Sequence, residues 1–166
     1  MTDSPRTDIW PVRTDRLQIR PMSAPDIDAM WQWRRQPDVN RWLGLAPATI
    51  EAFRERYLDP ERLASMHIVE LLPADDDLAP VPIGDIMIRI GDGWAQLEVA
   101  DQAKGVEAEL GWVLDPDHTG RGYATEAIRA VIDVCFGPLG LRRVHAGCFA
   151  DNEPSWRLME LSLIHI

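Results

Sequence analysis

Apolar and polar residues alternate in several short segments of the chain, and a period of two residues is typical of half-buried β-strands. The clearest segments are residues 14–22, 83–90 and Glu107–Leu114. Weaker alternation predicts further strands at Met66–Leu71, 94–100 and 142–149. In the second of the clear segments Ile86 and Ile88 face one way, while Asp85 and Met87 face the other.

A period near 3.6 residues predicts helices between these strands. We expect Ser23 to cap the first helix, with Asp26 in the capping-box position, and we expect that helix to end before Pro37. The remaining helices are expected at 48–58, from near Glu126 to about 135, and at 153–160. The pattern predicts a single mixed α/β domain whose first half is antiparallel, with residues 38–46 as a loop between the first two helices.

The composition is that of a soluble globular protein. The chain has 166 residues, of which 46% are hydrophobic and 27% charged, and it contains no apolar run of the length that a membrane span needs. Residues 1–12 read as a loose polar tail without the apolar core of a signal peptide. We therefore expect a cytoplasmic protein that does not associate with membranes.

A formal net charge of −10 argues against nucleic acid as a partner, because nucleic-acid binders usually present a basic face. A negative field favours cationic partners such as amines, although the acidity can equally serve solubility. Cys135 and Cys148 are expected to be reduced and buried, and neither they nor the four histidines have the spacing of metal ligands, so we expect no metal.

Residues 117–127 read DHTGRGYATEA and place Gly120 and Gly122 between a predicted strand and a predicted helix. Unpaired backbone N–H groups and the helix dipole make such a helix start a binding site for phosphate, and glycines allow close approach. The dinucleotide fingerprint is incomplete, because Thr125 stands where its third glycine belongs, and the Walker A pattern is missing from the sequence. Coenzyme A, with its pyrophosphate and extended pantetheine arm, is the third candidate.

Three segments, TDRLQIR, ELGWVLDPDHTGRGYATEA and DNEPSWRLME, together resemble the GNAT acetyltransferase superfamily, in particular its RimJ/RimL-like branch of ribosomal-protein N-acetyltransferases. The resemblance implies the GNAT fold, a mixed and mostly antiparallel sheet flanked by helices, with acetyl-CoA as the donor. It also implies that the strands 107–114 and 142–149 separate to admit both substrates. The implied cofactor-binding residues are Trp112, Val113, Leu114, Thr119, Gly120, Arg121, Gly122, Tyr123, Ala124, Thr125 and Asn152.

Acetyl transfer to an amine requires a neutral amine, a donor for the oxyanion and a proton for the departing thiolate. We expect Glu109 to act as the base, a backbone N–H near Val113 to stabilise the oxyanion, and Ser155 to act as the acid. Many members of the superfamily have a tyrosine as the acid, but the corresponding position here is Met159. The plainer alternatives are that Glu109 is a solvated strand residue and that Ser155 caps a helix.

The acceptor is expected to be a primary amine, either a protein N-terminal α-amine, as on a ribosomal protein, or a small molecule, with the enzyme a monomer or homodimer. The candidate acceptor-binding residues are Trp31, Trp42 and Glu107, although core packing explains Trp31 equally well. A non-catalytic acyl-CoA-binding or regulatory module is the alternative function. A dinucleotide-binding enzyme is a third, disfavoured because its motif would follow the first strand.

The resemblance ends near residue 160, where the family continues with a K-L-G-F-like segment and two further strands. Here residues 161–166 read LSLIHI. We expect these six residues to be a non-native end of a single domain spanning 1–166, with the last two strands of the fold missing. The strand at 142–149 would then be an exposed edge.

Overall fold

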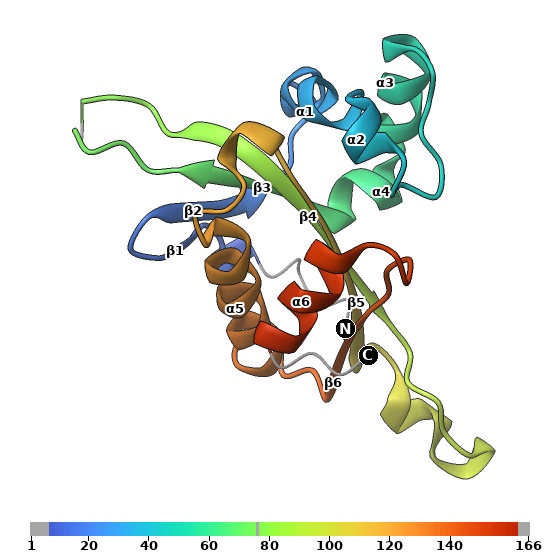
Figure 1. The fold of residues 1–166 in the computed structure, drawn as a ribbon. Helices are drawn as coiled ribbons and strands as arrows, with labels where there is room; N and C mark the ends of the chain where they lie inside the picture. The colour runs from blue at the N-terminus through green and yellow to red at the C-terminus, as the bar shows by residue number, and fades with distance from the viewer. Residues whose placement is uncertain (1–6, 76, 163–166) are drawn as a thin grey trace.

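The computed structural model describes residues 7–75 and 77–162, and over these residues six strands form one sheet in the order β1 to β6 (Figure 1). Neighbouring strands from β1 to β5 are antiparallel, whereas β6 runs parallel to β5. The predicted mixed α/β sheet with an antiparallel first half is therefore confirmed. The strands are β1 Val12–Arg13, β2 Leu17–Pro21, β3 Met66–Leu71, β4 Val81–Gly91, β5 Glu107–Leu114 and β6 Arg143–Ala146.

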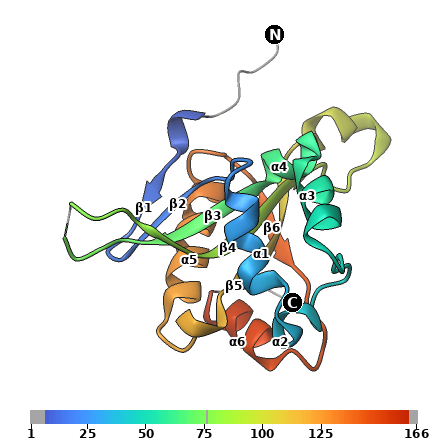
Figure 2. The same cartoon turned by 90° about the horizontal axis from the view of Figure 1, so that it is seen from above.

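Helices cover both faces of the sheet, as Figures 1 and 2 show from two sides. One face carries α1 Asp26–Arg34, α2 Pro37–Asn40, α3 Ile50–Leu58 and α4 Pro60–Ser65. The other face carries α5 Tyr123–Phe136 and α6 Glu153–Leu161. Three short 3₁₀ helices complete the described residues: η1 Thr7–Ile9, η2 Leu97–Ala103 and η3 Pro116–His118.

Each covered face has its own hydrophobic core. Under α5 and α6, buried residues of the sheet such as Ile19 and Leu110 pack with Ile128 and Val131. Under α1 and α3, Met30 and Phe53 pack with residues of β3. Because the sheet is covered on both sides, the polar residues that alternate along a strand can also be buried. Within the described ranges, no helix has the length and apolarity to span a membrane.

Asp85 shows the consequence of this double cover. Its side chain is fully buried, although alternation placed it on the polar face of β4. The carboxylate accepts hydrogen bonds from Trp33 Nε1 at 2.8 Å and from Arg34 Nε at 3.0 Å, and it forms an ion pair with Arg34 Nη2. Although burial disfavours the charge of Arg34, Asp85 holds the pKa of this guanidinium above its usual value. The cluster ties α1 to the middle of β4.

The start of α1 differs from the prediction. The helix begins at Asp26 with Pro25 in the N-cap position, so Ser23 is not its cap. Instead, the Asp26 carboxylate accepts the backbone N–H of Ser23 at 2.8 Å and its hydroxyl at 2.7 Å. The same carboxylate pairs with Arg20, and this pairing explains why a motif that reads as a capping box serves to join β2 to α1.

Three further segments differ from the prediction. Residues 94–100 do not form a strand, because Leu97–Ala103 is a 3₁₀ helix in a projecting segment where Trp94 and Leu97 are each 90% exposed. Parallel pairing of β6 ends at Ala146, which is earlier than expected. The predicted loop at 38–46 contains the end of the short helix α2.

The N-terminal end of the chain also departs from the expectation. Residues 7–13, assigned by the sequence largely to a loose tail, form η1 and β1, and the Trp10 ring lies 4.2 Å from that of His67. The expected tail is therefore shorter than 1–12, and residues 1–6 lie outside the described part. At the other end, Leu161 belongs to α6 and accepts a hydrogen bond from Arg129, while residues 163–166 lie outside the described part.

His67 makes the stability of the fold dependent on pH. Burial lowers the pKa of His67 from 6.5 to about 4, so the folded protein keeps it neutral while the unfolded chain protonates it. Between these values the unfolded state binds more protons, and the free energy of unfolding should therefore fall as the pH falls. We expect a loss of at most about 3 kcal/mol across this window, measured by urea denaturation at a series of pH values.

A His67→Gln variant should lose this slope between pH 6.5 and 4 while keeping the steeper loss below pH 4. That second loss belongs to carboxylates such as Asp26, whose pKa is held at about 2 because hydrogen bonds from Arg20 and Ser23 outweigh its burial. An unchanged slope in the variant would show that His67 is not its source.

Removing Arg34 should destabilise the protein strongly. Arg34→Met leaves the buried Asp85 charge without its cation, and we expect the free energy of unfolding to fall by about 3–5 kcal/mol. Arg54→Met is the matched control, because its ion pair with Asp28 is exposed and contributes little. Equal losses for the two variants in urea denaturation would contradict the role assigned to Asp85.

Candidate active site

The strands β5 and β6 separate in the middle of the molecule, as expected. They pair from Glu107 opposite Arg143 to Leu110 opposite Ala146, and there the pairing ends. Beyond this point β5 continues to Leu114, while the chain after β6 turns away through Gly147 toward α6. One edge of the second half of β5 is therefore left without a neighbouring strand.

The hydrogen-bond register decides which backbone groups lie on this open edge. The Asp115 N–H donates to the Ile83 carbonyl at 2.8 Å. The N–H and C=O groups of the odd-numbered residues of β5 therefore point toward β4. The Val113 N–H lies in that ladder, so an N–H near Val113 that stabilises an oxyanion would have to be that of Trp112 or Leu114. The backbone groups of Trp112 and Leu114 point to the opposite side, where β6 has ended.

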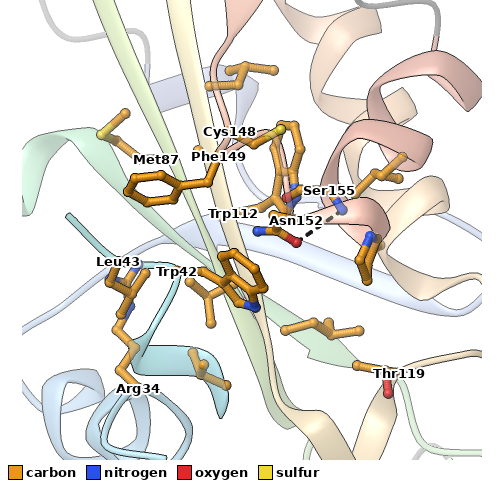
Figure 3. A pocket seen from close by; sticks show the side chains of 18 of the residues that line it. Arg34, Trp42, Leu43, Met87, Trp112, Thr119, Cys148, Phe149, Asn152 and Ser155 are labelled. Carbon is orange, nitrogen blue, oxygen red and sulfur yellow. Dashed lines mark hydrogen bonds between the residues drawn. The ribbon is translucent and has the colours of Figure 1, made fainter. Parts of the chain in front are cut away.

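A cavity of about 1210 Å³ opens at this separation. Figure 3 shows Trp42, Trp112, Asn152 and Ser155 around it, contributed by elements far apart in the sequence. The cavity extends from the α5 start, across the open edge of β5, to the wall formed by α1–α4. Most of the predicted site residues line it: Trp112, Val113, Leu114, Thr119, Gly120, Gly122, Tyr123, Ala124, Thr125, Asn152, Ser155 and Trp42.

The glycine turn lies at one end of the cavity. Gly120 has φ +73° and Gly122 has φ +79°, and the latter is the N-cap of α5. Only glycine adopts such angles at little cost, and here they direct the backbone of the turn into the start of the helix. The first N–H groups of α5 are thus available to an anion in the cavity.

Glu126 connects the glycine turn to the segment before β2, outside the cavity. Its carboxylate accepts the Thr14 hydroxyl at 2.6 Å and the Arg16 backbone N–H at 3.1 Å, and it pairs with the Arg16 guanidinium at 2.6 Å. Although burial raises it, these hydrogen bonds hold the pKa of Glu126 below its usual value. Arg16 also donates to the carbonyl of Arg121, whose side chain does not line the cavity.

The start of α6 lies across the cavity from β5. Asn152 is the N-cap, and its side-chain oxygen accepts the Ser155 backbone N–H at 3.4 Å, shown as the dashed line in Figure 3. The cap is therefore Asn152 and not Ser155, which leaves the Ser155 hydroxyl available to the cavity. Met159 is fully buried in the core, where no group from the cavity reaches it.

Besides Arg121, the structure leaves three further predicted residues, Glu109, Glu107 and Trp31, outside the cavity lining. Glu109 is half-exposed and pairs with Arg89 at 3.1 Å, and Glu107 pairs with Arg143 at 3.3 Å, both toward the end of β5 where β6 is still paired. Trp31 packs on Phe53 with ring centroids 5.1 Å apart, as the core-packing alternative required. Trp42 lines the cavity with its ring 6.4 Å from that of Phe149.

Sequence reasoning missed several residues of the wall. Arg34, Tyr57, Arg56 and Arg62 line the cavity, and no spacing motif in the sequence marks them as a group. Cys148 also lines the cavity and is only partly buried, so the expectation that it is buried was wrong. Cys135 is buried as expected, and burial raises the pKa of its thiol to about 11.

Comparison with known proteins identifies the family. The acetyltransferase (GNAT) domain family matches residues 16–161. An uncharacterized N-acetyltransferase, p20 of Bacillus licheniformis, is 28% identical over 152 residues, which cover 88% of this chain and 77% of that protein. A GNAT acetyltransferase from Bacillus anthracis superposes with a TM-score of 0.73 at 25% identity, covering 92% of this chain and 82% of the other.

Two further solved structures share the fold. The aminoglycoside acetyltransferase AAC(6')-Ib in complex with coenzyme A has a TM-score of 0.67 at 22% identity, with 88% of this chain and 82% of the other covered. Mycobacterium smegmatis RimJ in complex with CoA-disulfide has a TM-score of 0.65 at 20% identity, with 92% and 75% covered. With the family match over most of its length, the chain belongs to the GNAT acetyltransferases.

Proposed function

We propose that this protein transfers the acetyl group of acetyl-CoA to a primary amine inside the cavity between β5 and α6. The observation that carries the proposal is the separation of β5 from β6, which joins a phosphate-binding turn to a second binding wall. A donor and an acceptor can therefore meet beside the open edge of β5. The acceptor is a protein N-terminal α-amine, as in the RimJ/RimL-like branch, or the amine of a small molecule.

The donor's pyrophosphate binds at the glycine turn. The backbone between Gly120 and Thr125 offers unpaired N–H groups at the positive end of the α5 dipole, and the Gly120 position presents no side chain to the cavity. Thr119 and Tyr123 lie beside these groups on the cavity wall.

The pantetheine arm follows the open edge of β5. Its amides can pair with the outward backbone groups of Trp112 and Leu114 in the way that an added strand would. Asn152, across the cavity at the α6 N-cap, has an amide N–H₂ group that can contact the same arm. The thioester would then lie near Leu110, where the pairing of β5 with β6 ends, and close to Ser155.

In the transfer, the amine nitrogen attacks the thioester carbonyl, a C–N bond forms and the C–S bond breaks. The Ser155 hydroxyl is positioned to give the departing thiolate a proton, and the proton that the amine nitrogen loses as it becomes an amide restores the hydroxyl. Glu109 lies on the same face of β5 as Gly111 but outside the wall, so a role as base requires a bridging water and the loss of its pair with Arg89.

Replacing Gly120 should weaken acetyl-CoA binding specifically. Gly120→Ala strains a φ of +73° and turns an N–H group away from the pyrophosphate, and we expect about a tenfold loss of affinity. Gly140→Ala is the matched control, because its φ is +63°, it also has free space for a Cβ, and it lies outside the cavity. Binding is measured by calorimetry and by the shift in thermal midpoint with acetyl-CoA.

Both variants should lose similar stability without ligand, since the backbone strain is the same. Similar acetyl-CoA affinities in the two variants would remove the glycine turn from the donor site. A parent protein whose unfolding is unaffected by acetyl-CoA would contradict the proposed function itself. Acetyl-CoA binding without acetylation of any amine would favour a non-catalytic module.

Removing the Ser155 hydroxyl should slow the chemical step. Ser155→Ala is expected to lower kcat by about 10²-fold while acetyl-CoA affinity is retained, because Asn152 caps the helix through the Ser155 backbone. Ser162→Ala, at the other end of α6 and outside the cavity, is the control. An unchanged kcat in Ser155→Ala, measured by steady-state kinetics, would show that the thiolate takes its proton elsewhere.

A further inference from the structure

The acceptor end of the cavity is rich in arginine. Arg34 from α1, Arg56 from α3 and Arg62 from α4 line it. Among the described residues, Asp38 is the one residue of this wall that carries a carboxylate, and it is exposed to solvent. A chain with a formal net charge of −10 therefore presents a cationic surface at this place.

Two of these arginines lack an anionic partner within residues 7–75 and 77–162. Arg34 is neutralised by Asp85, whereas neither Arg56 nor Arg62 forms an ion pair there. The Nε of Arg56 is buried without a hydrogen-bond partner, and the Arg62 guanidinium lies 5.7 Å from the centre of the Tyr57 ring. A buried donor on a charged group is costly when it is unpaired, so the wall is suited to an anion that enters the cavity.

Tyr57 adds a neutral donor between the arginines. It is 4% exposed and lines the cavity, and its oxygen accepts a hydrogen bond from Arg34 Nη1 at 2.7 Å. Burial raises the pKa of Tyr57, against the opposing effect of the neighbouring arginines, so the hydroxyl keeps its proton. That proton can be donated to an oxygen of a bound ligand.

Resting on the proposed function, we propose that the acceptor is an amine that also carries a carboxylate, with Arg56, Arg62 and the Tyr57 hydroxyl binding the carboxylate. Arginine binds carboxylates through paired, charge-assisted hydrogen bonds. The same cations lower the pKa of a nearby amine and so favour the neutral form that attacks the thioester. A polycationic acceptor would meet repulsion at this wall.

The test uses pairs of acceptors that differ only in the carboxylate, each a free amino acid and its amide, with side chains of several sizes. Binding is measured by calorimetry on protein saturated with coenzyme A, so that no turnover is needed. We expect the acids to bind about tenfold more tightly than their amides. The amide has the less basic amine and is more often neutral, so a preference for the acid cannot come from the amine.

The variants Arg56→Gln and Arg62→Gln should each reduce this preference and raise KM for the acid, while the thermal shift caused by acetyl-CoA stays as in the parent. Arg54→Gln is the matched control on the same helix, because it pairs with Asp28 outside the cavity and should keep the preference. Arg56→Lys and Arg62→Lys should each retain part of the preference.

Equal affinity for acids and amides, or binding of neither, in protein that does bind coenzyme A would overturn the proposal and leave the proposed function intact. Preferential binding of the amides would also overturn it. If the parent protein does not bind acetyl-CoA at all, that result would contradict the proposed function instead.

Discussion

The position of the acceptor wall depends on one buried carboxylate. Asp85 accepts hydrogen bonds from Trp33 and Arg34 of α1, and Arg34 donates onward to Tyr57 of α3. Asp85 pairs in register with Val113, next to the open edge of β5. Because a buried charge without a partner is very costly, this network holds α1 and α3 at a defined distance from the open edge of β5, where we propose that transfer takes place.

The donor side is held by a different kind of constraint. Thr14 and Arg16, in the turn between β1 and β2, bind Glu126 in the first turn of α5, so the first hairpin of the sheet supports the glycine turn from outside the cavity. The turn itself presents backbone rather than side chains. In the proposed function, the donor half recognises a phosphate by geometry common to many sequences, whereas the acceptor half depends on particular arginines and a tyrosine.

The sequence predicted those parts whose signal is local. Alternation gave the bounds of β3 and β5 as observed, and the glycines with the apolar stripe that follows them predicted α5, which begins at Tyr123, slightly before the expected start near Glu126. It failed for Asp85, because a period of two separates the faces of a strand without telling whether distant helices cover both. It failed for Glu109 for a related reason: residues that share a face of β5 lie at different depths along it, and the cavity begins only where β6 ends.

The charge of the chain shows the same limit. A net charge of −10 suggested attraction of cationic partners, yet the wall that faces the acceptor carries three arginines, of which Asp85 compensates one. Surface charges are screened over about 8 Å at physiological salt, while charges lining a cavity act directly on what enters it. The acidic surface and the cationic wall therefore act at different stages. The surface affects which molecules approach, and the wall affects which of them bind with the amine neutral and directed toward the open edge of β5.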